Sequence, residues 1–148
     1  MPARTPFFAR SLQDADTWLA DLGHHLGTED ESVLYAVLKA VLHALRDRLP
    51  VEDAARLAAA MPMLMRGLYF EGWEPGPAAQ PAAPPAADEA DLLAEVERRL
   101  GGRGGIAAEA ALRGVLRVLA RHLDAGGLDG AAKVLPEGLI DADGRRAA

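Results

Sequence analysis

The residues best suited to binding chemistry lie in one short segment, residues 66–73, Arg-Gly-Leu-Tyr-Phe-Glu-Gly-Trp. Tyrosine, tryptophan and arginine are the types that most often anchor protein interfaces, because each combines a large body with polar groups. We therefore predict a partner-binding surface formed by Arg66, Tyr69, Phe70 and Trp73. In the alternative, Tyr69 and Trp73 fold back over a helical core and Arg66 caps a helix.

A second candidate is a basic stripe near the end of the chain. Arg113, Arg117 and Arg121 follow one another at intervals of four residues, so they share one face of a helix. This face could contact phosphate or an acidic partner. The alternative is a solvated helix surface, on which Glu109 pairs with Arg113 four residues later. The net charge of −6 argues against a general nucleic-acid binder, which normally carries an excess of basic residues.

Metal and catalytic chemistry have little support in the sequence. His43 and Asp47 are four residues apart and could supply two metal ligands from one helix face. A metal site needs a third ligand, and no recognisable motif provides one. No hydroxyl residue pairs with a histidine and a carboxylate in the manner of a hydrolase. We therefore predict no catalytic residue, no metal and no cofactor.

The helices that must position these residues are repeated within the chain. Residues 14–62 align with residues 88–136 without a gap, at an offset of 74 residues, with 13 identities in 49 positions. Nearly all of the identities are apolar, Gly or Pro, which indicates a duplicated structural unit. The repeat predicts that Leu38 and Leu112 are buried at matching places, as are Leu45 and Leu119.

Apolar residues recur at helical spacing, and no alternating strand pattern is found, so we predict an all-α protein of two tandem four-helix units. The expected organisation is an N-terminal arm at 1–13, a first unit at 14–74, a Pro/Ala linker at 75–87, a second unit at 88–142 and a frayed tail at 143–148. Units of this size are marginal alone, so they should pack together or form a homodimer.

Helix boundaries in the first unit follow from local residues. The first helix should run from about Asp16 to Leu26 and stop at Gly27, which favours a left-handed C-terminal cap. Thr28 and Glu31 form a capping box for a second helix that ends at Leu49. The third helix should cover 51–61, and the fourth should begin at Pro62 and end at Gly72, as proline at a first helical position and glycine at a last one indicate.

The composition places the protein in a general class without naming its activity. Cysteine is absent and no segment approaches the ~20 apolar residues of a membrane span, so we expect a cytoplasmic protein without membrane contact. The favoured function is a non-enzymatic interaction module with an unknown protein partner. The alternatives are a small-molecule or metal-binding protein with a pocket between the units, and a nucleic-acid-associated protein.

Two long motifs, residues 40–49 (AVLHALRDRL) and 61–73 (MPMLMRGLYFEGW), together with Trp18-Leu19, carry a family likeness. Through them the chain resembles a bacterial family of unknown function, the one numbered 2267 among domains of unknown function. The likeness covers residues 14–75 well and the second unit loosely. It implies an all-helical cytoplasmic bacterial protein with no established activity.

Overall fold

The structure is a computed structural model that describes residues 6–75 and 89–123. These residues form α1 (Pro6–Leu26), α2 (Glu31–Arg46), α3 (Val51–Ala59), α4 (Met63–Phe70), α5 (Glu89–Leu100), the 3-10 helix η1 (Arg103–Gly105) and α6 (Ala108–His122). The all-α prediction is confirmed. No helix among the described residues is both long enough and apolar enough to cross a bilayer.

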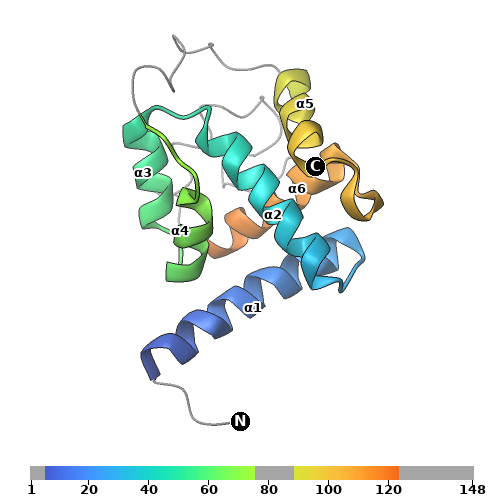
Figure 1. The fold of residues 1–148 in the computed structure, drawn as a ribbon. Helices are drawn as coiled ribbons and strands as arrows, with labels where there is room; N and C mark the ends of the chain where they lie inside the picture. Colours follow the sequence, from blue (N-terminus) through green and yellow to red (C-terminus); the bar gives the residue numbers. More distant parts are fainter. Residues whose placement is uncertain (1–5, 76–88, 124–148) are drawn as a thin grey trace.

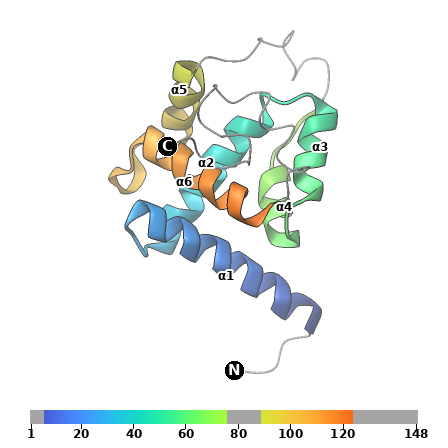
Figure 2. The ribbon, with the colours of Figure 1, turned by 180° about the vertical axis from the view of Figure 1, so that it is seen from behind.

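The helices surround one continuous core. Figure 1 shows α2 crossing the molecule, with α1 beneath it, α3 and α4 on one side and α5 on the other. Seen from behind in Figure 2, α6 crosses between α1 and α2. The packing follows this picture, because α2 contacts α5 and α6, and α1 contacts α6. The apolar stripes of these helices are therefore buried against one another in a single cluster.

The positions singled out by the repeat lie in this core. Leu38 and Leu112 are each 1% exposed, and Leu45 and Leu119 have no exposed surface, as predicted. The α5–α6 pair packs directly on α1 and α2, so within the described residues the two predicted units share their core. The predicted linker other than Pro75, the predicted helices after Leu123 and the predicted tail lie outside the described residues.

The first helix begins earlier than predicted. We expected an arm over residues 1–13, but α1 starts at Pro6, so residues 6–13 are helical. Proline is tolerated in a first helical turn, where its missing N–H has no partner to lose. Burial also holds this end in place, because Ser11 is buried and its hydroxyl lies 3.9 Å from the Met63 sulfur of α4.

The turn between α1 and α2 is capped by different residues than we predicted. Gly27 ends α1 in the left-handed conformation, with φ of +72°, as expected. The N-cap of α2 is Asp30 rather than Thr28, because the Asp30 carboxylate accepts from the N–H groups of Ser32 and Val33. Thr28 instead accepts a hydrogen bond from the Asp30 N–H through its hydroxyl, and so supports the cap.

The other boundaries agree to within a few residues. The α2 helix ends at Arg46, three residues before the predicted end, and a tighter turn follows in which the Leu49 N–H donates to the Arg46 carbonyl. Pro50 explains this, since a residue before proline avoids helical conformation. Gly72 follows α4 with φ of +72°, as expected for a helix stop.

Candidate functional site

The predicted contact segment, residues 66–73, makes several contacts within the fold. Tyr69 has no exposed surface, and its hydroxyl donates to the Ala54 carbonyl oxygen at 3.0 Å. Burial raises the pKa of Tyr69, so the phenol keeps the proton that this bond needs. Arg66 donates to the carbonyl oxygens of Ala58 and Met61, at 3.2 and 3.0 Å, and thereby caps the end of α3. Burial therefore removes Tyr69 from the predicted surface, and Arg66 has the capping role of the alternative.

The two remaining aromatic residues of this segment lie at the edge of the core. Phe70 and Trp73 are half-buried, and their rings stack with centroids 5.0 Å apart. Phe70 also meets the ring of Tyr69 edge-on, with centroids 5.3 Å apart. Both side chains pack against the core cluster, so part of each ring is unavailable to a partner.

The end of α4 is fastened to α2 by two side chains, which we call the α2–α4 clasp: His43 and Arg46. His43 Nε2 lies 2.8 Å from the Leu68 carbonyl oxygen, and because a carbonyl only accepts, Nε2 carries the proton. Arg46 Nη1 donates to the carbonyl oxygens of Tyr69 at 2.9 Å and Glu71 at 2.8 Å. These carbonyls lie at the end of α4, where a helix runs out of internal donors, and of the three only the Leu68 carbonyl also accepts from a backbone N–H of the described residues, that of Glu71. The clasp supplies side-chain donors to all three.

Both weak metal candidates, His43 and Asp47, have protein partners in the structure. The His43 ring is occupied by the α4 carbonyl. Asp47 accepts from Arg46 Nε at 2.8 Å and from Arg99 Nη2 of α5 at 2.7 Å. No group of three histidine, aspartate or glutamate side chains placed to hold a metal occurs in residues 6–75 and 89–123.

The predicted basic stripe is divided among different contacts. Arg113 pairs with Glu109 at 2.9 Å, which confirms the ion pair expected from their spacing. Arg121 reaches Asp21 of α1 at 3.2 Å. Only Arg117 is left without an ion pair inside the described ranges, so the stripe presents one uncompensated cation to solvent.

A groove that the sequence did not reveal lies between α1 and the start of α2. It has a volume of about 850 Å³ and is lined by Asp16, Leu19, Ala20, Gly23, His24, Gly27, Thr28, Glu29, Glu31 and Leu34. Gly23 allows the two helices to meet here, because a Cβ at this position would lie 2.6 Å from the Thr28 carbonyl oxygen. Leu19 and Leu34 supply an apolar floor, while Ala20 adds little bulk.

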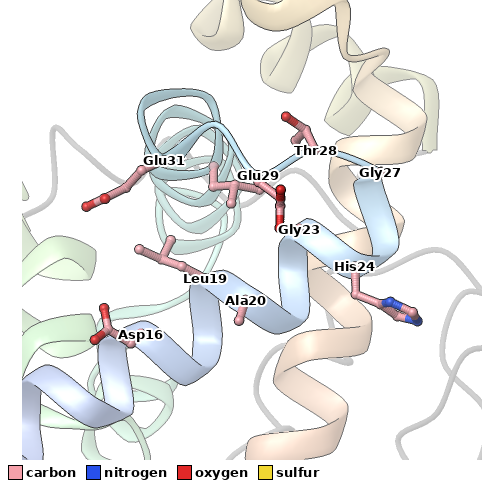
Figure 3. Close-up of a pocket in the computed structure, with 10 residues that line it drawn as sticks. Asp16, Leu19, Ala20, Gly23, His24, Gly27, Thr28, Glu29 and Glu31 are labelled. Carbon is pink, nitrogen blue, oxygen red and sulfur yellow. The ribbon is translucent and has the colours of Figure 1, made fainter.

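Three carboxylates border the α1–α2 groove. Figure 3 shows Asp16 on α1 and Glu31 on α2 at one end, Glu29 above Gly23, and His24 at the other end. None of the three carboxylates has an ion pair or hydrogen bond within the part of the chain that the structure describes. The positive end of α2 accounts for acids at Glu29 and Glu31, but Asp16 lies in the middle of α1 and gains nothing from a helix end. The groove is therefore a negatively charged surface with an apolar floor.

The family comparison fits this architecture. A family described as an uncharacterized conserved protein, DUF2267, matches residues 15–142. The chain belongs to the DUF2267 family. The match extends past the first unit, so it covers most of α1 and all of α2 to α6. No curated protein matches this DUF2267 chain.

Sequence reasoning missed the groove because its residues were explained by helix capping. The acidic run at residues 28–31 was interpreted only as the start of α2. A usable signal was the set of small residues Ala20, Gly23 and Gly27, which recur at three and four positions along one face of α1. Small residues on one helix face leave a shallow surface, and the nearby acids then determine its charge.

Proposed function

We propose that this DUF2267 protein is a non-enzymatic helical interaction module whose α1–α2 groove binds a basic amphipathic helix of a partner protein. The observation that carries the proposal is the uncompensated charge of Asp16, Glu29 and Glu31 beside an apolar floor. An amphipathic helix is recognised by laying its apolar face into such a groove. Lysine and arginine at the margins of that helix would meet the three carboxylates.

The rest of the molecule is consistent with this role. The acidic groove disfavours nucleic acid, since phosphate groups would meet carboxylates of the same sign. The proposed setting remains the cytoplasm. A homodimer also stays a prediction, for which the exposed side chains of Phe7 and Phe8 on α1 and of Met63 on α4 offer an apolar surface apart from the groove lining.

We further propose that α5 and α6 are a duplicate of α1 and α2. The support comes from buried positions 74 residues apart, which include Trp18 and Leu92, Leu22 and Val96, Val41 and Val115, Leu42 and Leu116, and Leu49 and Leu123. The acids of the groove have no acidic counterpart, because Asp16 corresponds to Ala90 and Glu29 to Arg103. An acidic groove is then a feature of the first helix pair alone. An experimental structure in which the two pairs fail to superpose would contradict the duplication.

The groove proposal is tested by titrating the full chain with two synthetic helical peptides of leucine and alanine, one carrying lysine and the other glutamate at the same positions. We expect saturable binding of the lysine peptide and none of the glutamate peptide, measured by fluorescence anisotropy. Neutralising the groove with Asp16→Asn, Glu29→Gln and Glu31→Gln removes three exposed charge contacts. At about 0.5 kcal/mol each, their loss weakens binding roughly tenfold.

A matched control separates the groove from net charge. Glu52→Gln, Glu74→Gln and Glu97→Gln change the total charge by the same amount at exposed positions outside the groove lining. This control should bind the lysine peptide nearly as well as the natural chain. Ala20→Trp should block binding by filling the groove, since Ala20 is exposed there and the fold has room for a larger side chain. Equal losses of binding affinity in both triple variants would refute the proposal.

A further inference from the structure

A smaller cavity of about 320 Å³ lies between α2, the end of α5 and η1, on a different set of residues from the groove. Its charged lining residues are Lys39, Arg99 and Arg103, and its ring residues are Tyr35 and His43. We infer that this cavity binds a small organic phosphate, a phosphomonoester with a ring-shaped body no larger than a mononucleotide. The inference takes up the prediction of a small-molecule pocket between the two helix pairs.

The glycine-rich turn after α5 is what brings Arg103 to the cavity. Gly102 and Gly104 have φ of +73° and +68°, which glycine adopts without a Cβ penalty. The turn lies against α2, because a Cβ on Gly104 would be 2.6 Å from Val33 Cγ1. Arg103 is thus held beside α2, where it lines the same cavity as Lys39. Two cations from distant parts of the chain therefore face one space.

The charges around the cavity leave room for an anion. Lys39 Nζ is paired with Glu71 at 2.8 Å, and Arg99 is paired with Glu95 and Asp47, none of which lines the cavity. Arg103 has no carboxylate partner in the described segments. No carboxylate lines the cavity itself. The lining is therefore positive, and a phosphate would find a free guanidinium there.

A phosphate is better suited to this lining than a carboxylate. The planar fork of a guanidinium matches the oxygens of a carboxylate and of a phosphate equally well, so it does not separate the two. The difference is the second charge of a phosphomonoester, which can draw Lys39 from its exposed partner. The Lys39–Glu71 pair is solvent-exposed on both sides, and pairs of that kind hold only weakly.

The aromatic lining of the cavity favours a ligand whose remaining part is a ring. Tyr35 is 45% exposed, and its ring centroid lies 6.0 Å from Lys39 Nζ. One face of this ring is thus available for stacking beside the phosphate position. The cavity volume lies at the low end for small-molecule sites, which excludes dinucleotides.

The test is calorimetric titration of the full chain at low salt with four probes: adenosine monophosphate, ribose 5-phosphate, inorganic phosphate and adenosine. The site is supported if either phosphomonoester binds more tightly than both inorganic phosphate and adenosine. The tighter of the two phosphomonoesters then shows which ring-shaped group the cavity prefers. No binding, equal binding of inorganic phosphate, or equal binding of adenosine overturns it.

Variants locate the binding. Arg103→Ala should weaken it by about tenfold or more, and Arg103→Lys should restore part of that loss, because lysine keeps the charge without the fork. Arg113→Ala is the matched control, since Arg113 is a cation on α6 outside the cavity lining. Equal weakening by Arg103→Ala and Arg113→Ala would show general charge attraction and overturn the inference. The melting temperature of each variant confirms that the fold is intact.

Discussion

Replacing Arg46 with methionine should weaken the fold because it removes the centre of the α2–α4 clasp. Arg46 is 4% exposed and donates to the carbonyl oxygens of Tyr69 and Glu71. A hydrogen bond to a charged group contributes about 1.5–3 kcal/mol, so losing two removes roughly 3–6 kcal/mol. Methionine keeps the apolar stem and avoids desolvating a buried charge, which offsets part of this loss. We expect the free energy of unfolding to fall by about 2–4 kcal/mol.

Urea unfolding followed by circular dichroism measures this change as a lower midpoint at constant slope. A domain usually has about 5–15 kcal/mol of stability, so Arg46→Met should still fold. Arg113→Met is the control, because it breaks an exposed ion pair with Glu109 that contributes about 0–1 kcal/mol. If Arg46→Met lies within about 0.5 kcal/mol of this control, the clasp does not stabilise the fold and the reasoning is refuted.

Three further substitutions test other contacts of the fold. Tyr69→Phe removes one hydrogen bond to a buried carbonyl of α3 and should lower the free energy of unfolding by about 1–2 kcal/mol in the same titration, whereas no change would contradict the bond's role. Burial holds the pKa of His43 below its ordinary value of 6.5, so the unfolded chain binds more protons in acid and stability should fall as the pH drops below 6.5. His43→Gln, which can still donate, should flatten that part of the pH profile, and an unchanged slope would count against the burial argument. Gly104→Ala places a Cβ against Val33 at a residue with positive φ, so it should lower the free energy of unfolding by about 1–2 kcal/mol or more and lower the thermal midpoint with it. Gly67→Ala is the control, because the space around Gly67 is open, and it should leave the thermal midpoint unchanged.

Local signals predicted the helices because the residues that start and stop them act over a few positions. Gly27 and Gly72 both end a helix in the left-handed conformation, as their place in the sequence indicated. The predicted N-cap of α2, Thr28, lies two residues before the observed one, Asp30. Both residue types are good N-caps, and only the direction of the backbone decides which side chain reaches the first N–H groups of the helix.

Contacts between distant residues could not be predicted in this way. The bonds from His43 and Arg46 to α4 span 25 and 23 residues, and no spacing rule reaches that far. The two motifs that carry the family likeness, residues 40–49 and 61–73, turn out to be the two sides of this one contact. The composition of residues 66–73 suggested a binding surface, because composition alone does not distinguish a buried tyrosine from an exposed one.

The candidate sites were hidden for a related reason. The α1–α2 groove depends on how closely Gly23 lets the two helices approach, which is a property of their crossing. The cavity proposed to bind a phosphate depends on η1 packing against α2, which places Arg103 and Lys39 on one lining. In each case the charged residues are visible in the sequence, but only the packing of the helices determines which of their side chains line the same groove or cavity.

The most direct test of the groove is an NMR titration of the isotope-labelled full chain with the lysine-bearing helical peptide. Backbone amide shifts should change in a saturable way at residues 16–34 and stay nearly constant at residues 66–73. Changes centred on residues 66–73 or on α6, or an absence of saturable changes, would contradict the assignment of the α1–α2 groove as the contact surface.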